Sequence, residues 1–232
     1  MSGILENLQK VQVIDDRKDA LQQRILKRSR EKDALCEEKQ RLEREFQDLK
    51  QALEKARLAL ARKELDLKEA EEKWTATRNK LYSGEITSSK ELAQWEKSMK
   101  KLEEIKSQLE DEILTEMENV ENLQSELQRK GHEVAEKGAL LAQQIAAKED
   151  EIANLEKELA TLEREWQEIA HSIPPETLAY YVELRKKFRD AVVPLVGEIC
   201  QGCHLSVPTI VAKAVRKKEG LVRCPNCGRF LY

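Results

Sequence analysis

Residues 81–92 read LYSGEITSSKEL, a short polar stretch between two long helical repeats. Gly84 suits the left-handed position that follows the end of a helix. Ser88 and Glu91 have the spacing of a capping box, which opens a helix. This stretch therefore predicts a turn at about residues 82–91 that joins two helices.

On either side of this turn, apolar residues recur at alternating steps of three and four, which is the repeat of a left-handed coiled coil. The repeat runs from Ile4 to Leu81 and resumes from Leu92 to Ile169. Two seams of matched length around one turn predict an antiparallel coiled-coil hairpin in residues 1–173.

Folding at the turn pairs residue i with about residue 173 − i, so Phe46 is expected near Leu127. The second helix has a weak region, because Gly131 and Gly138 each cost roughly 1 kcal/mol against Ala. The repeat also gains a four-residue step after Leu141, which locally unwinds a supercoil. Two hypotheses stay open for this region: a kink without a role, or a flexible joint or groove for a partner helix.

The charge of the chain is divided unequally along its length. The formal net charge is −3, and residues 174–232 contain ten Lys and Arg against five Asp and Glu, a net of +5. Residues 1–173 therefore carry −8, and the sign changes at Pro174-Pro175, where we place the domain boundary. The predicted fold class is mainly α: a long antiparallel coiled-coil hairpin followed by a small α+β domain in residues 174–232.

The composition, 37% charged and 4% aromatic, does not suit a single ordinary globular core. No apolar run approaches the roughly 18 residues that span a bilayer, so membrane insertion is not expected. The first residues, MSGILENLQK, lack a basic stretch followed by an apolar core, so we expect no signal peptide and a cytoplasmic protein. In that reducing compartment, paired cysteines favour metal binding over disulfides.

Four of the five cysteines form two Cys-x-x-Cys pairs, Cys200 with Cys203 and Cys224 with Cys227. Two such pairs that face each other complete the tetrahedron of thiolates that Zn²⁺ accepts. Four protein ligands leave no open position for water or substrate. The pattern therefore predicts one structural zinc ion and identifies the α+β domain of residues 174–232 as a C4 zinc-ribbon domain.

The residues beside the cysteines fit this interpretation. Gly202 and Gly228 are expected to adopt positive φ and to let backbone N–H groups approach the sulfurs. His204 is expected at the surface or beside the site rather than as a ligand. The sequence CQGCH also matches c-type haem attachment, which requires export, and CPNC could be a dithiol redox site, which lacks its usual βαβ surroundings. The haem interpretation also leaves the second cysteine pair without a role.

The sequence predicts a protein that is not an enzyme and has no small-molecule substrate, because it lacks a phosphate-binding glycine loop and a nucleophile–base motif. Basic residues in the C-terminal part, with Tyr180 and Tyr181 nearby, have the chemistry to hold RNA phosphates and stack a base. The same charges can instead simply solvate helix ends. The candidate nucleic-acid contacts are Arg185, Lys186, Lys187, Arg216, Lys217, Lys218, Arg223 and Arg229.

Three motifs, LYSGEITSSKEL, ICQGCHLSVP and VRCPNCGRFLY, give the whole chain a resemblance to a bacterial family that joins a coiled-coil hairpin to a four-cysteine zinc ribbon. The resemblance implies an adaptor or chaperone whose metal ligands are Cys200, Cys203, Cys224 and Cys227. The best understood members bind the enhancer-dependent alternative sigma factor and act in flagellar or type III secretion systems, and RNA binding is reported for the flagellar type. The resemblance implies a protein client without saying which one.

Two other functions stay open. A regulator that enters the secondary channel of RNA polymerase needs paired acidic residues at the hairpin tip to act near the catalytic Mg²⁺. The tip of this chain instead has Glu85 and Glu91 with Lys90 between them. A purely structural coiled-coil spacer would explain the hairpin but gives the ribbon no role beyond anchoring.

Overall fold

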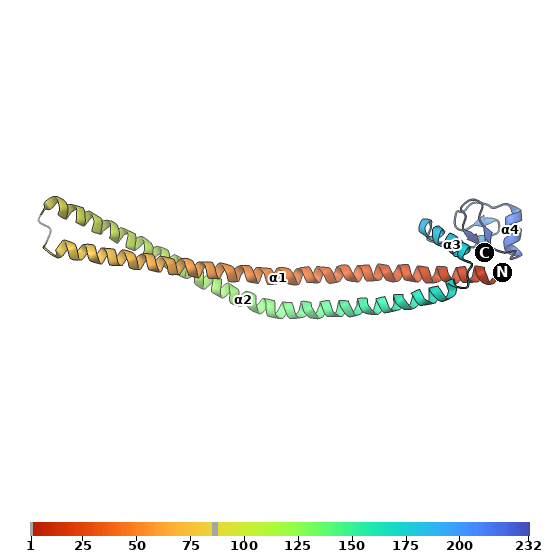
Figure 1. Ribbon diagram of the computed structural model, residues 1–232, viewed down its shortest axis with the longest axis horizontal. Coiled ribbons are helices and arrows are strands. Elements are labelled where there is room, and N and C mark those ends of the chain that lie inside the picture. Colours follow the sequence, from red (N-terminus) through yellow and green to blue (C-terminus); the bar gives the residue numbers. More distant parts are fainter. Residues whose placement is uncertain (1, 85–87) are drawn as a thin grey trace. The chain divides into compact units, whose positions relative to one another are not determined.

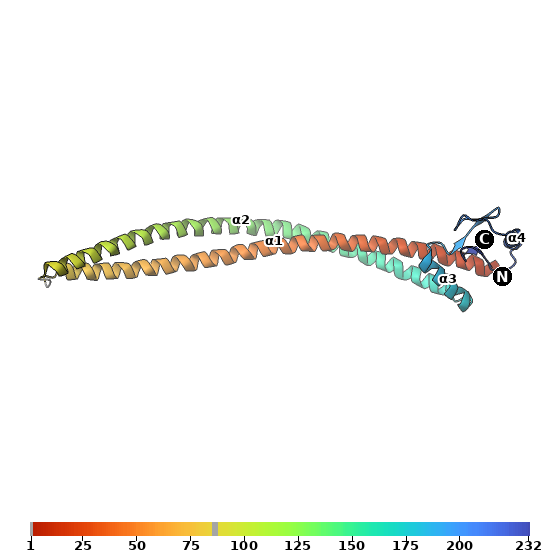
Figure 2. The same cartoon turned by 90° about the horizontal axis from the view of Figure 1, so that it is seen from above.

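A computed structural model describes residues 2–84 and 88–232 and confirms the predicted fold class. Helix α1 (Ser2–Tyr82) and helix α2 (Ser89–Ala170) run side by side in opposite directions (Figures 1 and 2). Gly84 has the predicted positive φ, 76°. The predicted tip residue Glu85 lies outside the described residues. No helix within the described ranges is long and apolar enough to cross a bilayer.

The chain divides into two compact units. The first, which we call the hairpin unit, is Leu35–Gln144, and it contains the middle and end of α1 and about the first two thirds of α2. The second, which we call the ribbon unit, combines Met1–Ala34 with Ile145–Tyr232. The start of α1 and the end of α2 therefore belong to the same compact unit as the C-terminal residues.

In the hairpin unit, α1 contributes small and branched apolar side chains to the seam, and Leu53, Ala56 and Ala70 are buried there. The seam also accepts a basic residue, because the Nζ atom of Lys63 lies 3.3 Å from a carboxylate oxygen of Glu112 and 3.4 Å from one of Glu116 on α2. A long side chain can bury its methylene groups at the seam and still reach a charge at its edge.

The register of the hairpin differs from the one expected from the sequence. A Cβ atom at Gly131 would lie 3.5 Å from the ring of Phe46, and Lys130 binds Glu45 at 2.6 Å. Phe46 therefore lies against a residue about one helical turn beyond Leu127. The repeat explains the error, since sliding one helix by three or four residues brings apolar positions opposite each other again.

The C-terminal part contains two short helices, α3 (Pro175–Lys187) and α4 (Thr209–Arg216), and five two-residue strands. Strand β1 (Val192–Val193) pairs in parallel with β5 (Phe230–Leu231), which pairs antiparallel with β4 (Val222–Arg223). Strands β2 (Leu195–Val196) and β3 (Ile199–Cys200) form a separate antiparallel pair.

One hydrophobic core of the ribbon unit combines α1 with the C-terminal elements, and a second core, around Cys200 and Cys224, consists of C-terminal residues alone. Leu8 and Val11 of α1 are fully buried beside Tyr181 of α3, Val192 of β1 and Phe230 of β5. The predicted register of the seam had paired these α1 residues with the end of α2 only. Figure 1 shows α3 and the strands beside the start of α1.

Polar contacts from α1 complete this junction. The side-chain oxygen of Gln12 accepts hydrogen bonds from the backbone N–H groups of Ala191 and Val192, at 2.8 and 2.7 Å. Its side-chain nitrogen donates to the carbonyl of Val192 at 2.9 Å. The hydroxyl of Tyr181 donates to Asp15 at 2.7 Å. Gln12 therefore supplies β1 with hydrogen bonds that a neighbouring strand would otherwise supply.

Replacing Gln12 by Ala is expected to destabilise the ribbon unit by about 1–3 kcal/mol, because it leaves buried N–H groups of β1 without a partner. Thermal unfolding followed by near-ultraviolet circular dichroism measures the change. The control is Gln23→Ala, an exposed glutamine on the same helix. Equal stability of the two variants would contradict the role assigned to Gln12.

Candidate zinc site and its basic surroundings

The two cysteine pairs lie in two tight turns with the same backbone geometry. In the first, the N–H of His204 donates to the carbonyl of Cys200 at 2.8 Å, and in the second, the N–H of Gly228 donates to that of Cys224 at 2.8 Å. His204 and Gly228 both have positive φ, 58° and 77°. Each turn thus needs a left-handed residue directly after its second cysteine, and a histidine in that conformation costs roughly 1–2 kcal/mol.

The four Sγ atoms lie within 4.8 Å of one another. The Sγ atoms of Cys200 and Cys227 are 3.9 Å apart, and those of Cys203 and Cys224 are 3.8 Å apart. Four sulfurs placed about 2.3 Å from a central ion at tetrahedral angles are separated by about 3.8 Å. The cysteines therefore fit one zinc ion, and they are the residues that would hold it. Bound there, zinc would link the two turns and supply folding free energy rather than reactivity.

The thiols respond to burial and to nearby backbone N–H groups. Burial raises the pKa of Cys227 to about 12. Burial also raises the pKa of Cys200, although the N–H groups of Cys203 and Gly202 act in the opposite direction. For Cys203, burial is outweighed by the N–H of Leu205 and by the neighbouring thiols, so its pKa is lowered. These N–H groups are the contacts to sulfur that the sequence predicted.

The two glycines of the turns serve different purposes. Gly228 has the predicted positive φ and also gives space to Tyr180, whose hydroxyl donates to the Gly228 carbonyl at 3.0 Å. Gly202 was predicted to need positive φ, and this prediction is wrong, since its φ is not in that region. Instead a Cβ atom on Gly202 would lie 2.5 Å from the guanidinium of Arg229, so the glycine makes room for that side chain.

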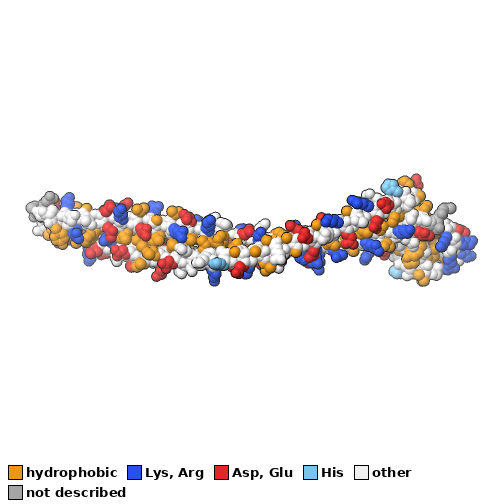
Figure 3. All heavy atoms as spheres, turned by 90° about the horizontal axis from the view of Figure 1, so that it is seen from below, with side chains coloured by type: hydrophobic (Ala, Val, Ile, Leu, Met, Phe, Trp, Pro, Cys, Tyr) orange, Lys and Arg blue, Asp and Glu red, His pale blue; other side chains and the backbone are white. Residues whose placement is uncertain are grey.

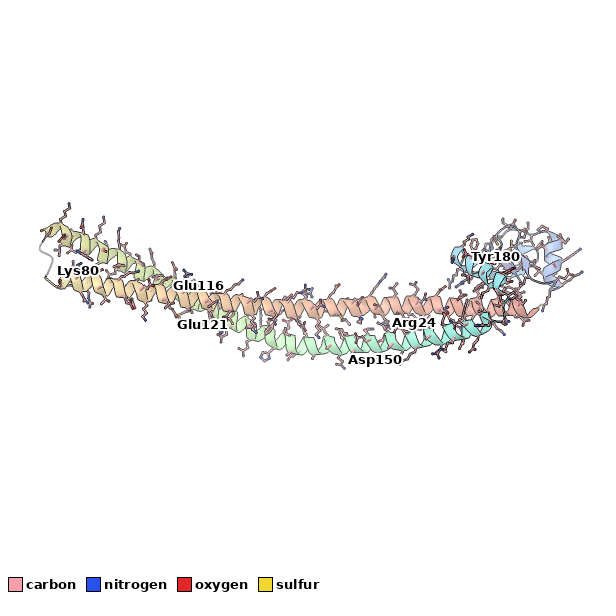
Figure 4. The ribbon with its side chains drawn as sticks, in the orientation of Figure 1. Arg24, Lys80, Glu116, Glu121, Asp150 and Tyr180 are labelled. Carbon is pink, nitrogen blue, oxygen red and sulfur yellow. The ribbon has the colours of Figure 1, made fainter. Side chains whose placement is uncertain are left out.

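Two of the candidate nucleic-acid contacts stack on aromatic rings. The guanidinium carbon of Arg223 lies 3.8 Å from the ring centre of Tyr180, a residue of α3 (Figure 4). The guanidinium carbon of Arg229 lies 4.0 Å from the ring centre of Phe188. Both arginines therefore help to hold α3 against the ribbon.

Arg185 on α3 binds α1. Its guanidinium donates to Asp16 at 2.7 Å and to Asp19 at 2.8 Å, and the side chain is only 12% exposed. Burial acts to lower the pKa of Arg185, but its hydrogen bond to Asp16 and nearby negative charge raise the pKa overall. Arg185 therefore joins the C-terminal part to α1 rather than facing solvent.

The remaining candidates lie at the surface. Lys186 pairs with Glu183 at 2.6 Å, Lys217 with Glu219 at 3.5 Å, and Arg216 donates to the carbonyl of Gly197 at 3.2 Å. Lys187 and Lys218 make no ion pair with any described residue and are exposed. Basic side chains gather where α4 lies in the ribbon unit (Figure 3). The structure thus places the eight candidates on several faces instead of one.

Sequence reasoning missed the α1 residues that support the site. Gln12, Asp15 and Asp16 contact β1 or α3, although more than 160 positions separate them from those elements. Their positions in the sequence do not indicate these contacts. Gln12 and Asp16 lie outside the apolar repeat, as solvent-facing residues do, so the repeat does not predict that they contact β1 or α3.

Comparison with known proteins agrees with this description. Residues 11–189 match the family of the CT398-like coiled coil hairpin domain, and residues 199–231 match the C4-type zinc ribbon domain. The C-terminal part is thus a C4-type zinc ribbon for one structural zinc ion, as predicted. These two families are not families of known enzymes. No curated protein matches the chain.

Three solved structures share the fold. CT398 from Chlamydia trachomatis aligns with a TM-score of 0.87 at 19% identity, covering 99% of this chain and 97% of that one. The HP0958 protein from Helicobacter pylori aligns with a TM-score of 0.62 at 19% identity, covering 98% of this chain and 96% of that one. A protein from Mycobacterium smegmatis aligns with a TM-score of 0.69 at 18% identity, covering 98% of this chain and 97% of that one. At these identities, the likeness shows the fold alone.

Replacing Cys224 and Cys227 together by Ser is expected to reduce the zinc content from one ion per chain to none and to unfold the ribbon. The helical circular dichroism signal should largely persist, because the seam of the hairpin unit contains none of these residues. Elemental analysis and circular dichroism measure the two effects, with Cys36→Ser as the control. Loss of most helical signal would contradict the separate stability of the hairpin.

Zinc affinity is expected to fall as the pH falls. In the metal-free site, the pKa values of Cys200 and Cys227 are raised above the ordinary thiol value, so both carry protons at pH 6–8 that zinc must displace. Displacing at least two protons predicts a decrease of about a hundredfold or more per pH unit. Competition with a chelator at two pH values measures it, and an affinity that does not change with pH would contradict the assignment.

Proposed function

This chain belongs to the family of CT398-like coiled-coil hairpin proteins, and from this premise we propose that it is a cytoplasmic, non-enzymatic adaptor or chaperone. In this proposal both the hairpin and the zinc ribbon bind protein partners. The resemblance described above makes an alternative sigma factor, or a flagellar or type III secretion component, the proposed client. The residues that hold the zinc are proposed to be Cys200, Cys203, Cys224 and Cys227.

The observation that supports the adaptor function best is the shared core of the ribbon unit. Leu8 and Val11 of α1 are buried with Phe230 of the ribbon, and Gln12 binds β1 directly. A client that binds the ribbon therefore binds a domain whose core includes the start of α1. A closed four-thiolate site adds rigidity and offers no position for a substrate.

The first experiment is affinity capture of the tagged full-length chain from native lysate, with and without nuclease, followed by mass spectrometry. A sigma factor or secretion component retained after nuclease treatment supports the proposal. Core RNA polymerase without a sigma factor would favour the secondary-channel regulator, and Glu91 with its neighbours would be the first residues to mutate. Recovery of no specific protein would favour the structural spacer.

RNA binding is a second candidate function. It is supported by exposed basic residues on and after α4, of which Lys218 makes no ion pair with a described residue, and by Lys187 at the end of α3. Some of the eight predicted contacts are already engaged within the protein: Arg223 stacks on Tyr180, and Arg185 is paired with Asp16. These arginines are therefore poor candidates for binding RNA. A contact by α4 and its following turn is thus the narrower form of the proposal, with the zinc ribbon as its support.

Changing Arg216, Lys217 and Lys218 to Glu is expected to weaken RNA binding at least about tenfold near 0.1 M salt, because phosphate contacts dominate such affinities. The control carries the same charge change on exposed lysines of α2, Lys97→Glu, Lys100→Glu and Lys101→Glu. Filter binding at several salt concentrations measures both. An equal decrease in the two variants would attribute the effect to net charge and refute a contact by α4.

A further inference from the structure

Two leucines of α1 lie on the side of the helix opposite the hairpin seam. The seam of the hairpin unit uses Ala56 and Leu60, and the period of the repeat places Leu58 and Leu65 on the outer side. Their side chains are 64% and 62% exposed. Outer positions of a coiled coil are usually polar, and the others in this register along α1 are Gln9, Asp16, Gln23, Arg30, Glu37, Arg44, Gln51, Glu72 and Asn79.

Ala61 lies between these leucines and is also exposed. Residues spaced by three and four lie on one face of a helix, so Leu58, Ala61 and Leu65 form a continuous apolar strip, which we call the outer strip. A small residue at the centre of such a strip permits close approach of a second helix, as in other helix pairs with alanine at the contact.

The charges beside the outer strip change sign near its centre. Of the exposed residues that flank it, Lys55, Arg57 and Arg62 are basic, and the following Glu64, Glu69 and Glu72 are acidic, with Glu54 and Lys68 as the exceptions. A partner helix that runs antiparallel therefore meets opposite charge along its length, and a parallel copy meets like charge. This distribution favours a second copy of the same helix over an unrelated partner.

We propose that the outer strip is a self-association surface on which α1 of a second copy lies antiparallel, with the two-fold axis close to Ala61 and Arg62. In this register Leu58 meets Leu65 of the second copy. Lys55 meets Glu69, Arg57 meets Glu64, and Glu54 meets Lys68, each pair occurring twice by symmetry. All these side chains are exposed in the single chain.

The contacts that these residues make within one chain are compatible with the pairing. Glu69 lies 3.4 Å from Lys73, and Arg57 donates to Gln124 at 3.2 Å, both at the surface. Two like charges come close at the axis, where Arg62 lies beside Arg62 of the second copy. The side chain of Arg62 is exposed and long enough to turn into solvent. A dimer carries two zinc ribbons, which strengthens binding to a client with two sites.

Sedimentation equilibrium of the full-length, zinc-loaded chain from about 1 to 200 µM tests the proposal. The wild type is expected to dimerise in this range, and Leu58→Gln with Leu65→Gln should raise the dissociation constant at least tenfold. Glutamine has a helix propensity close to that of leucine, so the helix itself is retained. The control is Leu26→Gln, an outward leucine of the ribbon unit that is 45% exposed. A wild type that stays monomeric, or an equal effect of the control, overturns the proposal.

A charge exchange tests the antiparallel register. In a dimer of the variant Lys55→Glu, Arg57→Glu, the pairs of residues 55 with 69 and 57 with 64 contain only acidic residues. In a dimer of the variant Glu64→Lys, Glu69→Lys, the same pairs contain only basic residues. Each variant alone should dimerise at least tenfold more weakly than the wild type, and an equimolar mixture should form the mixed dimer with wild-type affinity at low salt. Circular dichroism confirms folding of both variants. A mixture that stays monomeric overturns the register.

Discussion

The burial of Leu8 and Val11 under the C-terminal elements is the contact on which the ribbon unit depends. The zinc ribbon has strands of only two residues, and the cluster of buried side chains that it forms by itself, around Cys200 and Cys224, is small. Zinc would link its two turns. The strand residues Val192 and Phe230 need an apolar surface to pack against, and α1 provides it. The helix supplies apolar side chains for packing and Gln12 for the hydrogen bonds of β1.

The same junction explains the behaviour of the basic residues. A net charge of +5 in residues 174–232 suggests a surface for nucleic acid when it is counted along the chain. In the folded unit, Arg185 neutralises Asp16 and Asp19 of α1, and Arg223 stacks on an aromatic ring. Part of the positive charge therefore balances the acidic hairpin and holds α3 in place. Exposed positive charge remains at the end of α3 and in and after α4.

The hairpin was predictable because its information is local and repeated. An apolar residue every three or four positions, a glycine at Gly84 and a capping residue at Ser88 leave one simple topology. Its register was not predictable, because the repeat matches itself after half a heptad. In the structure Phe46 faces Gly131. This register depends on how the side-chain volumes of the two helices fit together along the seam, and the apolar pattern of either helix does not contain that information.

The cysteine spacing by itself determined a four-thiolate zinc site, since tetrahedral coordination needs two facing turns of this length. The sequence also determined that two long helices fold back on each other. The tertiary structure alone decided what lies around the site: that Gly202 gives room to Arg229, that His204 takes a left-handed conformation, and that α1 completes the ribbon core. These features depend on contacts between residues far apart in the chain. Such contacts form only when the backbone has folded, so local sequence patterns do not predict them.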